Sequence, residues 1–179
     1  MAGYDYAGDG WYFVTISVKN TGFAFGRIED GRMVLNKWGD IVAEKWQWLA
    51  TQYKYVLLDE YIVMPDHFHG IIAISTSRRD MSRLVLERCN AEGENLNNSS
   101  DKSRHVRTIV QMKALSQLIG AFKTVSSKKI HLEGEVEFVW HRSFHDRIIR
   151  NEKELQAIRQ YIHNNPANWL ADMTEKFYE

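Results

Sequence analysis

Residues 61–72 read YIVMPDHFHGII, and this stretch predicts two neighbouring strands of an antiparallel sheet. Residues 53–64 form a first long strand that is rich in branched and aromatic side chains, and Pro65 and Asp66 break it. Residues 67–74 (HFHGIIAI) form the next strand, so we expect the two strands to pair as a hairpin.

The sequence on either side of this hairpin alternates between strand and helix patterns. Asn151 and Glu154 have the spacing of a helix N-cap and its third residue. This order of elements predicts an α+β fold in which an antiparallel sheet is backed by helices. We expect strands over 11–19 and 23–28, amphipathic helices over 35–49 and 106–125, short extended segments over 136–140 and 144–149, and a final helix from about 152 that ends at Pro166.

The composition is that of a single globular domain over residues 1–179. Hydrophobic residues make up 44% and charged residues 26% of the chain. Residues 77–105 are polar and non-periodic, so we expect an insertion there. Cys89 is the single cysteine, which excludes a disulfide framework. The first nine residues have no signal-peptide pattern, and no apolar stretch reaches the ~18 residues of a membrane span. We therefore expect a cytoplasmic protein without a membrane partner.

The charges balance over the whole chain but not along it. Lys and Arg number 23, as do Asp and Glu, so the formal net charge is zero. Residues 102–150, however, carry ten Lys and Arg against four Asp and Glu. Binding to nucleic acid depends on local neutralisation of phosphates, so this distribution is compatible with a localised DNA groove.

His67 and His69 are a candidate metal site. Residues two apart on a strand project from the same face, so both imidazoles can converge on one point while Phe68 packs behind them. Mg²⁺, Mn²⁺ or Zn²⁺ would suit such a pair, although imidazole favours the transition metals. The alternative is a pair of half-buried histidines that only form hydrogen bonds.

Tyr161 and Asn165 are four residues apart on the final helix and so share one of its faces. A phenol oxygen and an amide oxygen are then presented together on a rigid element. Two alternatives are structural. Asn165 could cap the end of the helix before Pro166, and Tyr161 could lie at the boundary of the buried face.

Four parts of the chain carry a family resemblance: the motif with both histidines (61–72), Trp140, and residues 144–151 (FHDRIIRN) and 161–166 (YIHNNP). In these parts the chain resembles the single-tyrosine HUH transposases, and within them the REP-associated tyrosine transposases. The resemblance implies a ferredoxin-like palm and a C-terminal helix that carries Tyr161. It implies that Tyr161 is the nucleophile and that His67, His69 and Asn165 hold a divalent metal, Mg²⁺ or Mn²⁺.

The same resemblance implies the substrate and the reaction. Family members cut single-stranded DNA next to hairpins, form a 5′-phosphotyrosine link and release a 3′-hydroxyl, and a second 3′-hydroxyl then rejoins the strands. Some relatives act as homodimers that exchange the tyrosine helix and others act as monomers, so the oligomeric state stays open.

Several basic side chains are candidate DNA contacts, each with a structural alternative. Arginine forms bidentate pairs with phosphate, but the two arginines before the final helix could instead pair with nearby carboxylates. The lysines at the end of the second helix could complement its C-terminus, and the two arginines after the histidine strand could simply be solvated. The candidates are Arg147 and Arg150, Lys123, Lys128 and Lys129, and Arg78 and Arg79.

Two other functions compete with a tyrosine transposase. A His-x-His metal hydrolase would need no tyrosine, but no carboxylate or third histidine stands at a convincing metal-binding spacing. A protein that binds DNA hairpins and has lost catalysis would keep both motifs. A covalent adduct with hairpin DNA distinguishes the transposase from both.

Overall fold

The computed structural model describes residues 10–19, 24–75 and 112–177, with side chains up to Trp169. The predicted insertion at 77–105, with Arg78, Arg79 and Cys89, lies outside these residues. The strands are β1 (Gly10–Ser17), β2 (Gly26–Glu29), β3 (Arg32–Leu35), β4 (Val56–Val63), β5 (His67–Ile74) and β6 (His145–Ile149), and the helices are α1 (Lys37–Gln52), α3 (Leu115–Leu132) and α4 (Glu152–Phe177).

The main sheet has four strands in the order β4-β5-β1-β6, and neighbouring strands are antiparallel. The chain visits β1, α1, β4, β5, α3 and β6 in turn, which is the β-α-β-β-α-β order of a ferredoxin-like unit. The predicted α+β fold with an antiparallel sheet backed by helices is confirmed. The predicted pairing of β4 with β5 around Pro65 and Asp66 is also confirmed.

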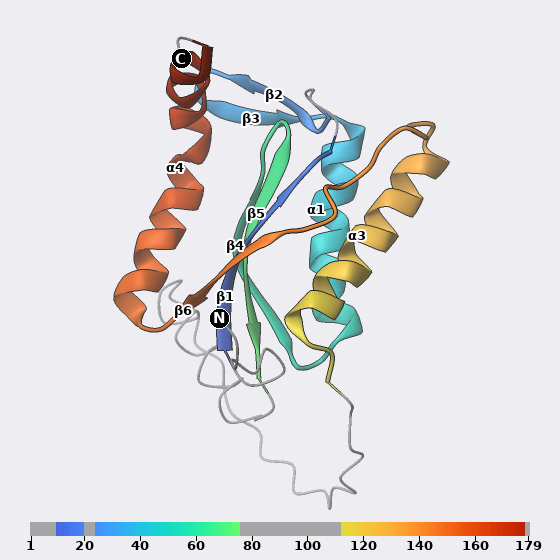
Figure 1. Cartoon of the computed structure of the whole chain (residues 1–179), viewed down its shortest axis with the longest axis vertical. Helices are drawn as coiled ribbons and strands as arrows, with labels where there is room; N and C mark the ends of the chain where they lie inside the picture. Colours follow the sequence, from blue (N-terminus) through green and yellow to red (C-terminus); the bar gives the residue numbers. More distant parts are fainter. Residues whose placement is uncertain (1–9, 20–23, 76–111, 178–179) are drawn as a thin grey trace, which may run out of the picture.

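The sheet lies between two helical layers, with α1 and α3 on one face and α4 on the other (Figure 1). Most of the core lies on the side of α1 and α3, where the Trp46 ring packs 4.7 Å from Phe68 and 5.4 Å from Phe122. Gly70 makes this possible, because a Cβ there would lie 2.7 Å from Trp46 Cζ2. On β5, Phe68 and Gly70 therefore face this core while His67 and His69 face α4.

The segment between β1 and α1 differs from the prediction. β2 and β3 form a separate two-stranded sheet, whereas we expected one strand over 23–28 and a helix from Leu35. Leu35 fits a helical period, but it ends β3. The helix begins after Asn36, whose side chain accepts hydrogen bonds from the backbone N–H groups of Trp38 and Gly39.

The predicted end of the final helix at Pro166 is wrong, because α4 continues to Phe177 with Pro166 inside it. A proline within a helix costs ~3 kcal/mol, since it lacks an N–H and crowds the preceding turn. Contacts on both sides of Pro166 offset this cost. Asn165 is buried, Trp169 packs against His67, and the β2–β3 turn at Gly31 approaches Ala167.

Two further segments differ in extent. The helix expected over 106–125 is α3, which runs to Leu132, while residues 106–111 are outside the described part. Residues 136–140 form no strand: Trp140 makes an isolated β-bridge to Val18, and the Val139 carbonyl accepts a hydrogen bond from the Lys19 N–H at 2.9 Å. Within the described ranges, no helix is long and apolar enough to cross a membrane.

Candidate active site

The two histidines lie at the start of β5 and face each other. Their Nε2 atoms are 2.9 Å apart. The turn before them is held from outside the hairpin, because the Asp66 carbonyl accepts a hydrogen bond from the Val18 N–H (2.9 Å) and the Pro65 carbonyl accepts one from the Phe25 N–H (3.1 Å). The sequence prediction that both imidazoles share one face is confirmed by the register of β5.

Each imidazole has an oxygen partner on its other nitrogen. His67 Nδ1 donates to the Asp66 carboxylate at 2.6 Å, which leaves its Nε2 free to act as an acceptor. His69 Nδ1 lies 2.8 Å from the Thr15 hydroxyl. A hydroxyl both donates and accepts, so either tautomer of His69 keeps a partner and Nε2 can offer its lone pair to a ligand.

His69 is buried, with 5% of its surface exposed. Burial, together with the nearby His67, lowers the pKa of His69 to about 3, and the Asp66 carboxylate only partly opposes this shift. The ring is therefore neutral near pH 7, which is the state that binds a metal ion.

Tyr161 approaches the histidines from α4. Its Oη lies 3.5 Å from His69 Nε2, and 49% of the residue surface is exposed. Phe13 of β1 contacts both rings, stacked on His69 at 5.3 Å and edge-on to Tyr161 at 6.0 Å between centroids. Phe13 thus fixes the relative orientation of the tyrosine and the buried imidazole.

Asn165 lies one helical turn beyond Tyr161, and Trp169 lies one turn further on. Trp169 packs against His67 with ring centroids 5.4 Å apart. Asn165 is 8% exposed and lies on the same helix face, between Tyr161, which approaches His69, and Trp169, which packs against His67. The helix period and this burial place Asn165 on the side of α4 that meets the histidine pair. Because α4 continues past it, Asn165 is not a C-terminal cap.

An ion pair and an apolar cluster hold α4 on the sheet. The Arg159 guanidinium donates to both oxygens of Asp59 on β4, at 2.8 and 2.5 Å. The apolar cluster joins the helix to β5 and β6, and its buried members are Ile71, Ile149, Leu155, Ile158 and Ile162.

The start of α4 is capped as the sequence predicted. The Glu154 N–H donates to Asn151 Oδ1 at 2.9 Å, and the Glu154 carboxylate accepts from the Arg150 N–H at 3.1 Å. By contrast, the ion pair between Asp59 and Arg159 was not predicted. No local pattern relates two residues that are 100 positions apart.

The arrangement suits a divalent cation. Both Nε2 atoms face one point, and each Nδ1 has the oxygen partner that metal-binding imidazoles usually have. In the part of the chain that the structure describes, no cluster of three His, Cys, Asp or Glu side chains could hold a metal ion. Among the described residues, a third ligand would therefore be of another type, and the amide oxygen of Asn165 is of such a type.

The predicted DNA-contacting cations are spread over different parts of the molecule. Arg147 of β6 is exposed and pairs in register with Phe13, so it projects from the same sheet face as the histidines. Arg150 is exposed in the short connection between β6 and the start of α4. Arg147 lies one strand from Phe13 of the candidate site, whereas Arg150 lies beyond Ile149, which pairs with Trp11, four residues along β1 from Thr15.

The three lysines lie on α3, on the other face of the sheet (Figure 1). Lys123 donates to the carbonyls of His141, Arg142 and Ser143, and burial lowers its pKa. Lys129 pairs with Glu133 at 2.6 Å, while Lys128 is exposed. The structure does not bring these lysines to the histidine pair.

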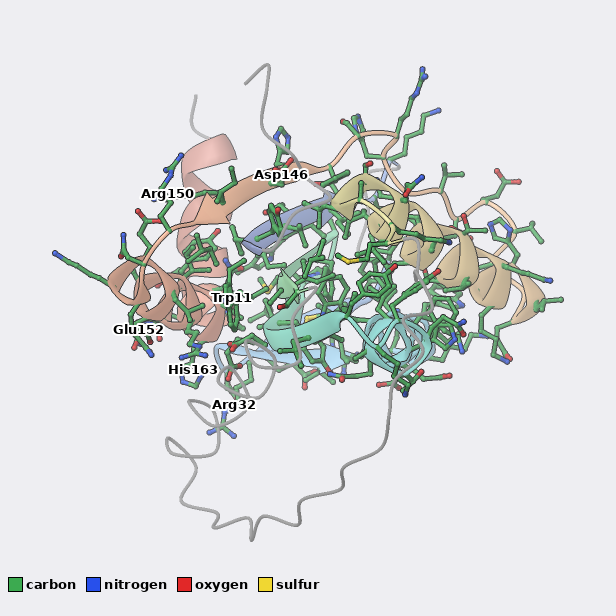
Figure 2. The ribbon with its side chains drawn as sticks, turned by 90° about the horizontal axis from the view of Figure 1, so that it is seen from below. Trp11, Arg32, Asp146, Arg150, Glu152 and His163 are labelled. Carbon is green, nitrogen blue, oxygen red and sulfur yellow. The ribbon has the colours of Figure 1, made fainter. Side chains whose placement is uncertain are left out.

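A cleft of about 700 Å³ opens beside α4, and Tyr161 is not among its lining residues. It is formed by β3, β4 and the helix, and its lining includes His163, Asn164 and Arg32. Figure 2 shows Arg32 and His163 on one side of the molecule and Asp146 and Arg150 on the other. His163 and Tyr161 are two residues apart on α4, about 200° around the helix axis, so their side chains point in different directions.

Comparison with known proteins points to one family. A family model described as "Transposase IS200 like" matches residues 75–165, which include Tyr161 and Asn165 and begin just after the histidine motif. A protein of unassigned function from Haemophilus influenzae is 33% identical over 174 residues, covering 94% of this chain and 87% of that protein.

A solved structure is similar over most of the chain. Its title is "Structure of the REP associates tyrosine transposase bound to a REP hairpin". The TM-score is 0.54 at 16% identity, and the match covers 94% of this chain and 74% of the other. This likeness confirms the fold.

Proposed function

The chain belongs to the IS200-like transposase family, and from this premise we propose that it cuts and rejoins single-stranded DNA next to a hairpin, with Tyr161 as the nucleophile. One observation carries the proposal: the Tyr161 hydroxyl lies 3.5 Å from a neutral, buried imidazole, on a helix face that also presents Asn165. A hydrolase would need no tyrosine at this position.

In the proposed reaction, Tyr161 Oη attacks the phosphorus of one phosphodiester. A bond forms between Oη and phosphorus while the bond from phosphorus to the 3′ oxygen breaks. The tyrosine proton passes to solvent, and the leaving oxygen takes up a proton and becomes a free 3′-hydroxyl. One phosphodiester bond replaces another, so a second 3′-hydroxyl can reverse the attack and join new strands without ATP.

His67, His69 and Asn165 would hold a divalent ion, Mg²⁺ or Mn²⁺. When bound, such an ion supplies positive charge to the non-bridging phosphate oxygens and acts as a Lewis acid. Asp66 and Thr15 hold the imidazoles through Nδ1, so that both Nε2 atoms face the site.

The proposed site is complete within one chain. Arg159 and Asp59 tie α4 to the sheet of the same molecule, and Tyr161 meets His69 without a second copy. We propose that Tyr161 acts in cis, in a single domain that spans residues 1–179. A homodimer would then not be needed for cleavage.

Incubation with end-labelled hairpin DNA that carries single-stranded flanks, in Mg²⁺ or Mn²⁺, tests the proposal on a denaturing gel. We expect a covalent protein–DNA band with the wild type and none with Tyr161→Phe, while native-gel binding is unchanged. Tyr53→Phe is the matched control, because Tyr53 packs near α1 on the other side of the sheet and should not affect the band.

Each other outcome contradicts the proposal. A band that persists in Tyr161→Phe would place the nucleophile elsewhere. Cut strands without a covalent band would favour a metal hydrolase, and a native shift without cutting would favour a protein that only binds hairpins.

A further inference from the structure

On the sheet face that carries the site, α4 covers the strand β4 more than it covers β1 and the edge strand β6. The helix packs on β3 and β4 and diverges from β6 as it rises from its first turns (Figure 1). On β1, the residues that face α1 and α3 are fully buried, whereas Trp11, Phe13, Thr15 and Ser17 on the other face are only partly buried. A partly open strip therefore runs from the histidines across β1 to the edge strand β6.

The register of the strands places two polar side chains of β6 on this strip. Thr15 pairs with His69 on one side and with His145 on the other, so the three residues form a row across β5, β1 and β6. Phe13 likewise pairs with Arg147. Two strand spacings separate His145 from His69, which is ~10 Å.

These two side chains have the chemistry to bind phosphate. Arg147 and His145 are exposed, and neither forms an ion pair within the described part of the chain. Asp146 lies between them but projects from the opposite face, since side chains alternate along a strand. The strip thus presents a guanidinium and an imidazole N–H to solvent, and the carboxylate between them, that of Asp146, is on the other face of β6.

We propose that His145 and Arg147 bind the backbone phosphates of the unpaired strand next to the scissile phosphate, and so guide that strand across β1 to Tyr161. The inference rests on the proposed function, because it takes single-stranded DNA as the substrate. It adds a direction: the strand enters over β6 and not through the cleft near His163.

Salt-dependent binding tests this path with charge-matched variants. Arg147→Gln and Lys128→Gln each remove one positive charge, but Lys128 lies on α3 beyond the sheet. Binding of a fluorescent hairpin with a single-stranded flank is measured by anisotropy from 50 to 300 mM salt. We expect Arg147→Gln to weaken binding about tenfold and to reduce the slope of log K against log salt by about 0.7, as loss of one single-strand phosphate contact predicts.

Two control variants test whether the DNA contacts the face of β6 that carries Arg147. Lys128→Gln should leave the slope unchanged, and so should Asp146→Asn, which alters the charge of the same strand on its other face. A hairpin without the flank should bind Arg147→Gln and the wild type equally. Equal slopes for Arg147→Gln and Lys128→Gln with the flanked hairpin would overturn the inference.

A disulfide cross-link maps the path directly. In a Cys89→Ser background, His145→Cys or Arg147→Cys is paired with DNA that carries a thiol tether on one phosphate at a time. We expect cross-links at the first or second phosphate from the cleavage site, and cross-links to the stem alone would overturn the path.

The covalent band with wild-type protein is recorded in parallel. At subsaturating DNA, Arg147→Gln should form less adduct than the wild type, whereas Asp146→Asn should form as much as the wild type. A wild type without adduct would refute the proposed function, whereas unchanged binding in Arg147→Gln with a normal adduct would refute only the path.

Discussion

The ion pair between Asp59 and Arg159 should control how firmly α4 is docked, and its contribution follows from its geometry. The guanidinium makes two charge-assisted hydrogen bonds, at 2.8 and 2.5 Å. The Asp59 side chain is 7% exposed and that of Arg159 is 25% exposed. Exposed pairs contribute less than ~1 kcal/mol, and breaking a fully buried pair costs ~3–5 kcal/mol. We therefore expect a coupling energy of ~2 kcal/mol.

A double-mutant cycle measures this coupling energy. Asp59→Asn, Arg159→Gln and the double variant are unfolded in urea beside the wild type, and the coupling energy is the non-additive part of their free energies of unfolding. Arg27 and Glu29 are a matched control pair on the β2–β3 hairpin, with side chains 70% and 49% exposed. Their coupling energy should stay below ~1 kcal/mol.

Hydrogen exchange locates the effect in α4. Loss of ~2 kcal/mol from docking would raise the frequency of helix opening about 30-fold, and amide protection in the middle of α4 should fall accordingly. Formation of the covalent adduct should fall less, because the apolar cluster around Ile158 still holds the helix. A coupling energy equal to that of the control pair, or unchanged protection in α4, would refute the reasoning.

Two further predictions concern the core and the histidine environment. Gly70→Ala should lower the free energy of unfolding by ~2 kcal/mol, because the added Cβ would press on Trp46. Gly120→Ala should raise the free energy of unfolding by up to ~1 kcal/mol, because no atom lies within 4 Å of the added Cβ and alanine favours the helix. Urea unfolding measures both changes. Thr15→Val should weaken Mn²⁺ binding ~10–100-fold in calorimetry because His69 Nδ1 loses its partner, while Thr15→Ser should restore it. Equal Mn²⁺ affinities for Thr15→Val and Thr15→Ser would argue against a role of the Thr15 hydroxyl in holding His69 for the metal.

Local patterns predicted the hairpin of β4 and β5 well, because each signal there acts over a few residues. Pro65 ends one strand, and in the strand 67–74 successive side chains point to opposite faces, which puts His67 and His69 on one face. The same local rules failed at Pro166 and Leu35. A proline stops a helix only when nothing beyond it offsets the lost hydrogen bond, and here packing of Trp169 against His67 does.

The contacts that complete the candidate site had no local signal. Thr15 meets His69 across 54 positions, and Asp59 meets Arg159 across 100. Thr15 lies in an ordinary strand sequence, WYFVTIS, that contains nothing to distinguish it from a structural residue. Its partner is decided by the pairing of β1 with β5, which depends on the whole sheet.

The register of β5 links the fold to the candidate site. Phe68 and Gly70 must face the α1 and α3 side, because Trp46 fills the space over Gly70 and packs against Phe68. A slip of one residue would turn every side chain of the strand to the other face. Both imidazoles would then enter the apolar core and Phe68 would face α4. Packing of one tryptophan on one glycine therefore fixes the direction of His67 and His69, and mutations in that core should alter the site without touching it.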